Sequence, residues 1–347
     1  MEKYVRFDRN MSSIVKGFAI LFMIKLHSYG QGLYEVPLNY DHAFWFAHDG
    51  FNICVGIFAF MVGFGYAFSK TKDLKYAWQH IKKLYIPYIT IFLLFILPTC
   101  YKEFFASGWD MMAYTLTGLD FSFYYYNWFI YVFIYAMLVM PAISRFIVKK
   151  PLRNSVIAII AFYFLEVFSH FFIMPYLNKT WHFFLFNCLT LTPIILLGYL
   201  FAHEHYYERI RIDKLPKILV AVVCVLALVA MIYADSLLRV GAGIVFEFFY
   251  APIAIGAIVI LFSKFELKYL RKVMIKLGWA SMYMWFLQAL VHTPIVRQVY
   301  QPIVTIFSDV NLVVIWTAIV LFIAAWLLRS VIDYLLGLIS HKNVSKF

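Results

Sequence analysis

Two ionisable residues, Lys16 and His27, lie eleven positions apart inside the first apolar segment of the chain, residues 12–29. Eleven residues of α-helix come within about 20° of three full turns, so both side chains project from one face, about 16 Å apart along the axis. Ionisable groups are costly in hydrocarbon and are commonly functional there. The spacing predicts a functional helix face with a cation near one membrane surface and a titratable base near the other. Lys25 falls on the opposite face and is predicted to reach outward to the interface.

Further polar residues are predicted inside or beside other apolar segments, Glu166 near the middle of its span and the others nearer the depth of His27. They are Asp49, Glu166, His170, Glu247, Gln288 and His292. We expect His27, Asp49, His170, Glu247, Gln288 and His292 to converge on an outward-facing polar cavity. Two plainer explanations stay open. Histidines at helix ends often lie among lipid headgroups, and buried carboxylates such as Glu166 and Glu247 can be paired for structural reasons. Aromatic residues such as Trp128 are typical of the interfacial belt but can also line a site.

A basic stretch follows the second apolar segment and includes His80, Lys82 and Lys83. It is compatible with an anionic cytosolic ligand, such as the phosphates of a nucleotide-containing cofactor. Membrane topology alone also predicts a basic loop there. The chain has no GxxxxGK[ST], GxGxxG, HExxH or GxSxG motif, so sequence gives no support for conventional nucleotide, zinc or serine-hydrolase chemistry, and no metal is expected.

The elements that position these residues are transmembrane helices. Apolar residues make up 64% of the 347-residue chain and charged residues 14%, and the mean hydropathy is +0.80. Soluble domains are nearer half apolar and a quarter charged. Long continuous apolar runs exclude the alternating strands of a β-barrel. The four cysteines, Cys54, Cys100, Cys188 and Cys224, show neither metal-ligand spacing nor a disulfide framework.

We therefore predict an all-α polytopic bundle of about ten transmembrane helices, forming one integral-membrane domain over residues 1–347. The first segment is expected to serve as an uncleaved signal-anchor. The predicted spans are 12–29, 49–69, 81–99, 124–143, 155–175, 181–202, 216–233, 242–262, 276–296 and 311–337.

The distribution of Lys and Arg predicts the orientation. With both termini in the cytoplasm, 24 of these residues fall at the inner ends or loops and four fall outside, Lys102, Lys179, Arg239 and Arg297. This bias follows the positive-inside rule. The net charge of +12 is then explained by topology and anionic inner-leaflet lipid, and nucleic acid is not an expected partner. The expected location is the cell membrane, the inner or plasma membrane, and the sequence does not indicate an oligomeric state.

Several weak motifs occur in a fixed order along the chain. They are Lys16 followed after ten residues by His27, FAFMVGFGYAF at 58–68, HIKKLYIPY at 80–88, NWFIYVFIYAML at 127–138, LLGYLF at 196–201 and LGWASMYMWFLQ at 277–288. In this order and spacing the chain resembles the acyltransferase 3 family, integral-membrane acyltransferases of cell-surface carbohydrates. Three positions depart from the family pattern: Lys16 stands where many members have arginine, Val62 replaces a serine, and Gln288 stands where a histidine is frequent.

The resemblance implies transfer of an acyl group, usually acetyl, from cytoplasmic acyl-CoA to an outward-facing carbohydrate hydroxyl. Lys16, Lys82 and Lys83 would then meet the phosphates of the donor. His27 would act as general base or carry the acyl group transiently, oriented by Glu247 or Asp49. Trp128, Gln288 and His170 are predicted to line the acceptor site, in contact with carbohydrate and close to membrane lipid.

Two other functions fit a polytopic protein. In a transporter or flippase of a polar or glycan substrate, Glu166, His170 and Glu247 would form a proton relay. The sequence shows neither an internal repeat nor pairs of interrupted helices, which such transporters often have. A glycosyltransferase using a lipid-linked sugar would normally need a larger outer loop or domain. Acyl transfer is therefore the preferred interpretation.

Overall fold

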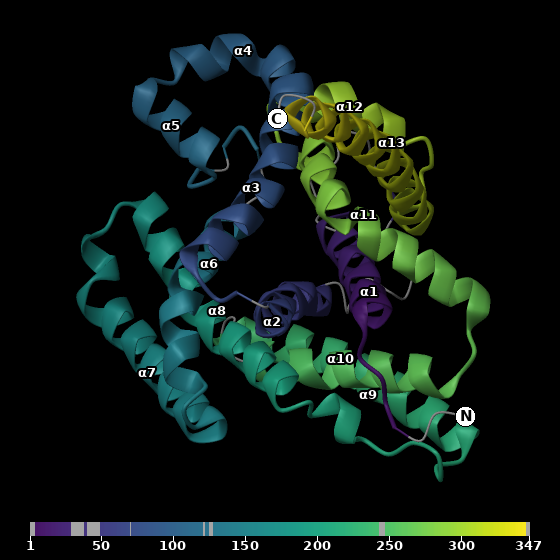
Figure 1. The fold of residues 1–347 in the computed structure, drawn as a ribbon. Helices are drawn as coiled ribbons and strands as arrows, with labels where there is room; N and C mark the ends of the chain where they lie inside the picture. The colour runs from purple at the N-terminus through teal and green to yellow at the C-terminus, as the bar shows by residue number, and fades with distance from the viewer. Residues whose placement is uncertain are drawn as a thin grey trace.

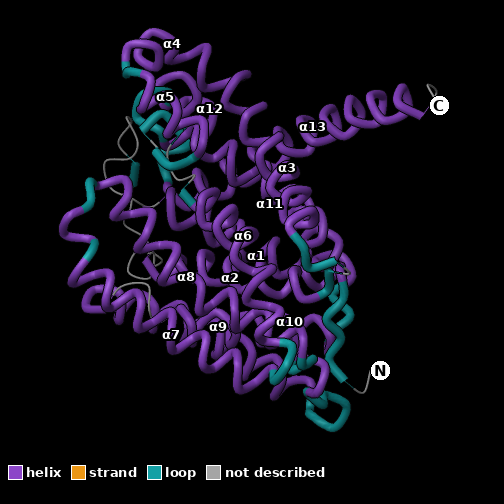
Figure 2. The backbone as a smooth tube through the Cα atoms, turned by 60° about the vertical axis from the view of Figure 1, so that its left-hand side comes forward, coloured by secondary structure: helices purple, strands orange, loops and turns teal. Residues whose placement is uncertain are grey.

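The computed structural model describes residues 4–28, 38–39, 49–69, 71–120, 122–124, 128–242 and 247–344, without the side chains of 238–242 and 335–344. Within these residues the chain is almost entirely helical (Figures 1 and 2). Its elements are α1 (Arg9–Ser28), η2 (Asp49–Asn52), α2 (Ile53–Ala67), α3 (Leu74–Ile91), η3 (Phe92–Ile96), α4 (Leu97–Ala106), α5 (Trp109–Thr117), α6 (Phe129–Ile147), α7 (Pro151–Phe172), η4 (Met174–Tyr176), α8 (Lys179–His203), η5 (Tyr207–Arg209), α9 (Lys217–Ala242), α10 (Glu247–Lys264), α11 (Lys268–His292), α12 (Arg297–Val304) and α13 (Val310–Val344).

The predicted polytopic helical bundle is confirmed. Among the described residues, nine helical stretches are long and apolar enough to cross a membrane. They match nine of the ten predicted spans. The tenth prediction, 276–296, falls on α11, whose 25 residues are also long enough to cross. α11 is more polar because Lys268, Arg271, Lys272 and Lys276 lie in its first half.

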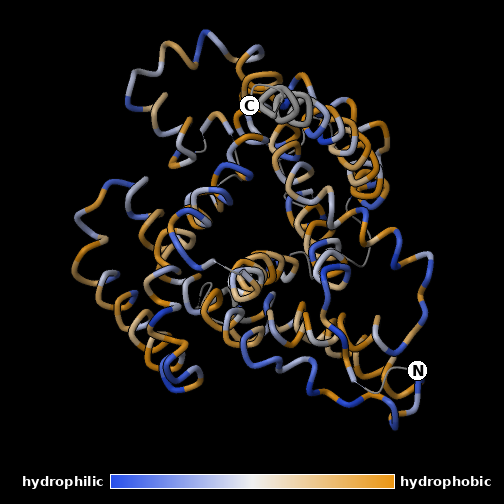
Figure 3. Tube along the Cα trace, viewed as in Figure 1, coloured by the Kyte–Doolittle hydropathy of each residue, from blue (hydrophilic) through white to orange (hydrophobic). Residues whose placement is uncertain are grey.

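Connecting segments gather at two opposite ends of the bundle, as alternating spans require. At one end the N-terminal segment meets the loop after α8, where Val5 N donates to Ile210 O at 3.0 Å. The buried Lys264, at the end of α10, also donates to Ile212 O at 2.5 Å. At the other end, Asn39 N donates to Ser308 O at 2.7 Å. The first group holds loops predicted to be cytoplasmic, and Figure 3 shows that its segments near the N-terminus are largely hydrophilic.

Two closely packed helix pairs form the centre of the bundle, α1 with α11 and α2 with α8 (Figure 1). Both depend on glycine at the crossing. A Cβ on Gly278 would lie 1.8 Å from Ser13 O, and one on Gly198 would lie 2.0 Å from Phe60 O. Gly63 meets Ile195 O in the same way, at 1.7 Å. Several glycines of the sequence motifs are therefore contact points between helix backbones.

Apolar side chains are exposed along the outer faces of the peripheral helices. On α7, α9 and α13 they include Ile160, Phe164, Phe171, Val222, Leu226, Val229, Ile315, Ile319 and Ile323. An exposed apolar band of this kind is expected where a helix contacts lipid. The chain is thus a multi-pass membrane protein. In Figure 2 the C-terminal part of α13 extends beyond the body of the bundle.

Two short helices, α5 and α12, fall in regions predicted as loops. The third predicted span, 81–99, lies within a longer helical stretch, Leu74–Ala106. The π-helical turn η3 interrupts this stretch. After this stretch the chain turns back through α5. The hydroxyls of Tyr85 and Tyr88 on α3 donate to the carbonyls of Leu116 and Thr115 at the end of α5. These contacts fix α5 against α3.

Candidate functional site

His27 lies at the end of α1 and is paired with α11. Gln288 Nε2 is 2.6 Å from His27 Nδ1 and 3.4 Å from Met23 O. His292, one turn further along α11 and fully buried, places its ring centroid 6.1 Å from that of His27 in an edge-on arrangement. The structure therefore brings together three of the residues predicted to converge, His27, Gln288 and His292.

The amide of Gln288 can support either neutral form of the His27 ring. With Nε2 towards Nδ1, the amide donates a hydrogen bond and the ring proton lies on Nε2. A half-turn of the amide places Oε1 there instead, where it accepts from Nδ1–H, and the ring then carries its lone pair on Nε2. In the first orientation Oε1 is buried and has no hydrogen-bond partner among the described residues. The second orientation gives His27 the form that a general base needs, but it removes the contact of the amide nitrogen with Met23 O.

Lys16 occupies the same face of α1 nearer the opposite end. Its side chain is half-buried, and its ammonium makes no hydrogen bond or ion pair with a described residue. The nearby charge of Arg329, on α13, repels it. The Arg329 guanidinium lies 4.0 Å from the ring centroid of Trp279 and 3.4 Å from Asp333 Oδ2. Arg329 also donates to Trp279 O, and Asp333 is exposed. Lys16 is therefore a candidate to bind an anion.

α1 is an unbroken helix between these two positions. The eleven residues from Lys16 to His27 therefore correspond to a rise of about 16 Å. α11 packs along the same stretch, with Gly278 against Ser13 near one end and Gln288 against His27 near the other. The α1–α11 pair thus carries a cationic site and an imidazole at two separate depths.

The two carboxylates proposed as partners of His27 lie beside α1, in η2 and at the start of α10. η2 packs against α1, and the Phe51 ring lies 4.2 Å from Lys25 Nζ. Asp49 is exposed at the start of η2. Glu247 is 1% exposed and accepts a hydrogen bond from Asn52 Nδ2. The described contact of His27 Nδ1 is with Gln288, so the orienting roles of Asp49 and Glu247 stay predictions.

The remaining predicted site residues lie on other helices. Lys82 and Lys83 are exposed on α3, where Lys82 Nζ lies 5.3 Å from the Trp78 ring centroid and no described contact joins either lysine to Lys16. His170 is exposed on α7, at the periphery of the bundle, where α7 packs against α6 and α8 rather than against α1 or α11 (Figure 1). These positions do not join the cluster around His27.

Trp128 is connected to α11 through aromatic contacts. It is half-buried before α6, and its ring lies 6.0 Å from that of Phe129 and 6.1 Å from that of Phe183. Phe129 in turn lies 5.9 Å from Trp285, one turn before Gln288. Asn127, the first residue of the same motif, lies outside the described residues. Trp128 therefore adjoins the outer half of α11 without a described contact to His27.

Arg329 is the site residue that sequence reasoning missed. It was counted only as a cytoplasmic charge, although it lies inside the predicted span 311–337. A cation within an apolar span is a signal of function in its own right. Its relation to Lys16 could not be predicted, because nothing in the sequence indicates that α13 packs against α1.

Comparison with known proteins identifies the family of the chain. The sequence profile of the acyltransferase 3 family, described as an acyltransferase domain, matches residues 12–330. No curated protein matches the chain, and no solved structure matches it. The matched residues include Lys16, His27, Gln288 and Arg329. The chain belongs to the acyltransferase 3 family and contains a membrane acyltransferase domain.

Proposed function

We propose that this acyltransferase moves an acyl group, most simply acetyl, from cytoplasmic acyl-CoA to a hydroxyl of a carbohydrate outside the cell membrane. The observation that carries the proposal is the pairing of two sites on one face of α1. His27 contacts Gln288 at one end of this face, where we assign the base, and Lys16 lies at the other end, where we assign it, with Arg329, to bind an anion. The excess of Lys and Arg in alternate loops supports a cytoplasmic position for the Lys16 end.

In this proposal Lys16 and Arg329 bind phosphate oxygens of the donor. Both are cations, and the structure gives Lys16 no anionic partner among the described residues. The extended pantetheine arm of the donor would cover much of the roughly 16 Å that separates Lys16 from His27. The thioester would thereby approach the imidazole while the nucleotide stays at the cytoplasmic surface.

His27 performs the proton transfer. With Nδ1–H donated to Gln288 Oε1, the Nε2 lone pair accepts the proton of the acceptor hydroxyl. The hydroxyl oxygen bonds to the thioester carbonyl carbon, the carbon–sulfur bond then breaks, and His27 returns the proton to the leaving thiolate. The products are an ester and free CoA thiol. Gln288 acts by fixing the tautomer and direction of the ring, and the His292 ring lies edge-on to it.

The test is acyl-CoA turnover by the purified full-length protein in nanodiscs, followed by thiol release and by mass analysis of a panel of short glycans. His27→Ala is expected to lower transfer at least about 10²-fold, the lower end of general-base effects. His182→Ala is the matched control, since this half-buried histidine lies in the first turn of α8 and contacts Met174 O in η4. Transfer by His27→Ala at the wild-type rate would refute the role of the base.

The donor site is tested separately by affinity for acyl-CoA. Lys16→Ala is expected to raise KM for the donor by about tenfold, the loss of one charge-assisted contact. Lys25→Ala is the control, because Lys25 lies on the opposite face of the same helix and packs on Phe51. Unchanged donor affinity in Lys16→Ala would overturn the cofactor role of this lysine. If acyl-CoA did not bind to the wild-type protein at all, the evidence would favour a transporter.

A further inference from the structure

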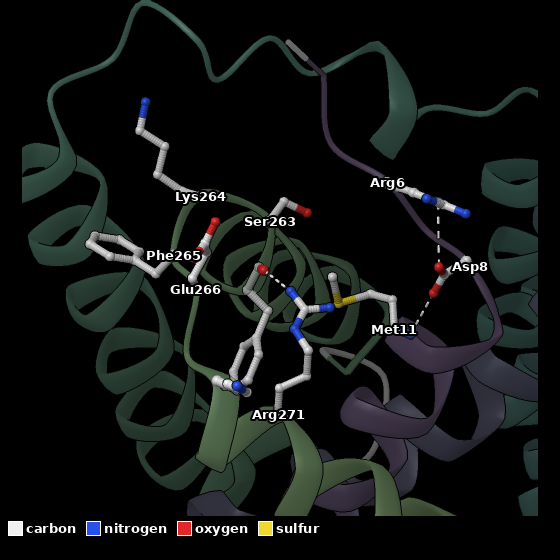
Figure 4. A pocket seen from close by; sticks show the side chains of 10 residues that line it. Arg6, Asp8, Met11, Ser263, Lys264, Phe265, Glu266 and Arg271 are labelled. Atoms are coloured by element: carbon white, nitrogen blue, oxygen red, sulfur yellow. Dashed lines mark hydrogen bonds and ion pairs between the residues drawn. The ribbon is translucent and has the colours of Figure 1, made fainter. Parts of the chain in front are cut away.

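The two ends of the bundle present different surfaces. At the end that holds the N-terminal segment, charged side chains such as Arg6, Glu266 and Arg271 surround a surface cavity, as Figure 4 shows. At the opposite end, the short helix α12 exposes mainly apolar side chains. The sequence from 298 to 308, which includes most of α12, contains no charged residue. This composition is unusual for a connection that lies in water.

The polarity of α12 is partly inverted relative to a helix on a water-exposed surface. Val299 and Ile303 lie one turn apart and are 56% and 52% exposed. Gln301 is 2% exposed, and its Nε2 donates to Val291 O on α11 at 3.3 Å. In water, a helix buries its apolar side and exposes its polar side. The opposite arrangement is expected where the exposed side of a helix meets hydrocarbon.

Two hydrogen bonds set the depth of α12 relative to the membrane. Trp316 Nε1 donates to Ile303 O at 3.0 Å, and Trp316 is the seventh residue of α13, about 9 Å along the axis from its first residue. Tyr300 OH donates to Phe95 O at 2.7 Å. Phe95 lies eleven residues before the end of the helical stretch Leu74–Ala106. Both partners of α12 lie inside candidate membrane spans, so α12 lies beside these spans rather than beyond their ends.

The exposed side of α12 also continues the apolar surface of its two neighbours. Ile315 and Ile319 are exposed on α13, and Leu93 and Leu94 are exposed on η3. The hydrogen bonds from Trp316 and Tyr300 join α12 to these same two elements. The exposed band that indicates lipid contact on α13 therefore extends across α12 to η3.

We propose that α12 lies within the outer leaflet of the membrane, with Val299 and Ile303 in contact with lipid acyl chains. Tyr300 and Trp316 lie beside it, and amphipathic aromatic residues of this kind are enriched at membrane interfaces. The polar contacts of α12 are directed inward, to η3, α11 and α13, so one lipid-covered helix joins three elements of the bundle. This contact with lipid is independent of acyl transfer.

The test measures the accessibility of spin labels on the full-length protein in phosphatidylcholine nanodiscs. The label is attached to Val299→Cys or Ile303→Cys, and its collisions with oxygen, which concentrates in hydrocarbon, are compared with its collisions with a water-soluble nickel chelate. Ile319→Cys, on the exposed apolar side of α13, is the lipid control, and Glu266→Cys, exposed at the opposite end of the bundle, is the water control. The four native cysteines are buried, and the wild type treated with the label gives the background signal.

We expect the ratio of oxygen to nickel collisions at Val299 and Ile303 to match the ratio at Ile319 and to exceed that at Glu266 several-fold. A ratio equal to that at Glu266 would show that water covers α12, and it would overturn the proposal. Low accessibility to both reagents would show that protein, such as a second copy of the chain, covers this side, and it would overturn the proposal as well. The thermal unfolding midpoint of each labelled variant, compared with that of the wild type, confirms that the variant is folded.

Discussion

Gly278→Ala is expected to disable the enzyme by separating two helices rather than by removing a functional group. The new Cβ would lie 1.8 Å from Ser13 O, where ordinary contact begins at 3.4 Å. The clash is with backbone, so side-chain rotation cannot relieve it. α1 and α11 would have to move apart by about 1.5 Å at this point. If the helices separate as rigid rods, the 2.6 Å contact between His27 and Gln288 is lost as well.

The expected loss of turnover is on the order of 10²-fold, the effect of misplacing a catalytic group by about 1 Å. Gly17→Ala should be milder, because its Cβ would lie 2.5 Å from Met274 O. Gly65→Ala is the control, since its Cβ would have no atom within 4 Å, and it should stabilise α2 by roughly 0.5–1 kcal/mol.

The assay is thiol release in nanodiscs, with thermal unfolding of each variant measured in parallel to confirm that it is folded. Activity should fall in the order Gly65→Ala, Gly17→Ala, Gly278→Ala. Wild-type turnover in a folded Gly278→Ala protein would refute the argument that close approach of α1 and α11 positions the base.

Three further predictions concern single side chains. Gln288→Leu should lower kcat about 10²-fold with little change in KM for the donor, because His27 loses its orienting partner; restored kcat in Gln288→His would support this, and an unchanged kcat in Gln288→Leu would exclude it. Asn52→Ala should destabilise the protein by about 1.5–3 kcal/mol in denaturant titrations, since Glu247 is 1% exposed and loses a donor; a change under about 0.5 kcal/mol would contradict that. Arg329→Gln should raise KM for the donor about tenfold, with partial rescue in Arg329→Lys; an effect confined to kcat would indicate a structural role through Trp279.

The sequence predicts the long helices, but it does not predict which helices pack against one another. Span-length apolar runs predict α1, α6, α8 and α13 because a hydrocarbon layer requires about 20 apolar residues per helix. α5 was missed because its nine residues are too short to register as a span and lie in a region that reads as an outer loop. Its position depends on hydrogen bonds from Tyr85 and Tyr88, which no local pattern encodes.

The candidate site was predictable where it follows helical geometry. Lys16 and His27 share a face because the spacing along one helix fixes it. The contact of His27 with Gln288 depends instead on how α1 packs against α11. The family motif marks position 288, and the structure shows that the residue there contacts His27. Lys82 and Lys83 were predicted to join the donor site but have no described contact with Lys16. Membrane topology alone produces such a basic stretch, whether or not it binds a ligand.

The continuity of α1 has a mechanical consequence. A rotation of about 10° around its axis moves a side-chain tip by about 1 Å, and a stiff helix applies the same rotation at both ends. A motion that adjusts Lys16 towards a ligand therefore also shifts His27 relative to Gln288. In the proposed reaction, binding of the donor near Lys16 is therefore mechanically coupled, through the α1 backbone, to the position of the base on the other side of the membrane.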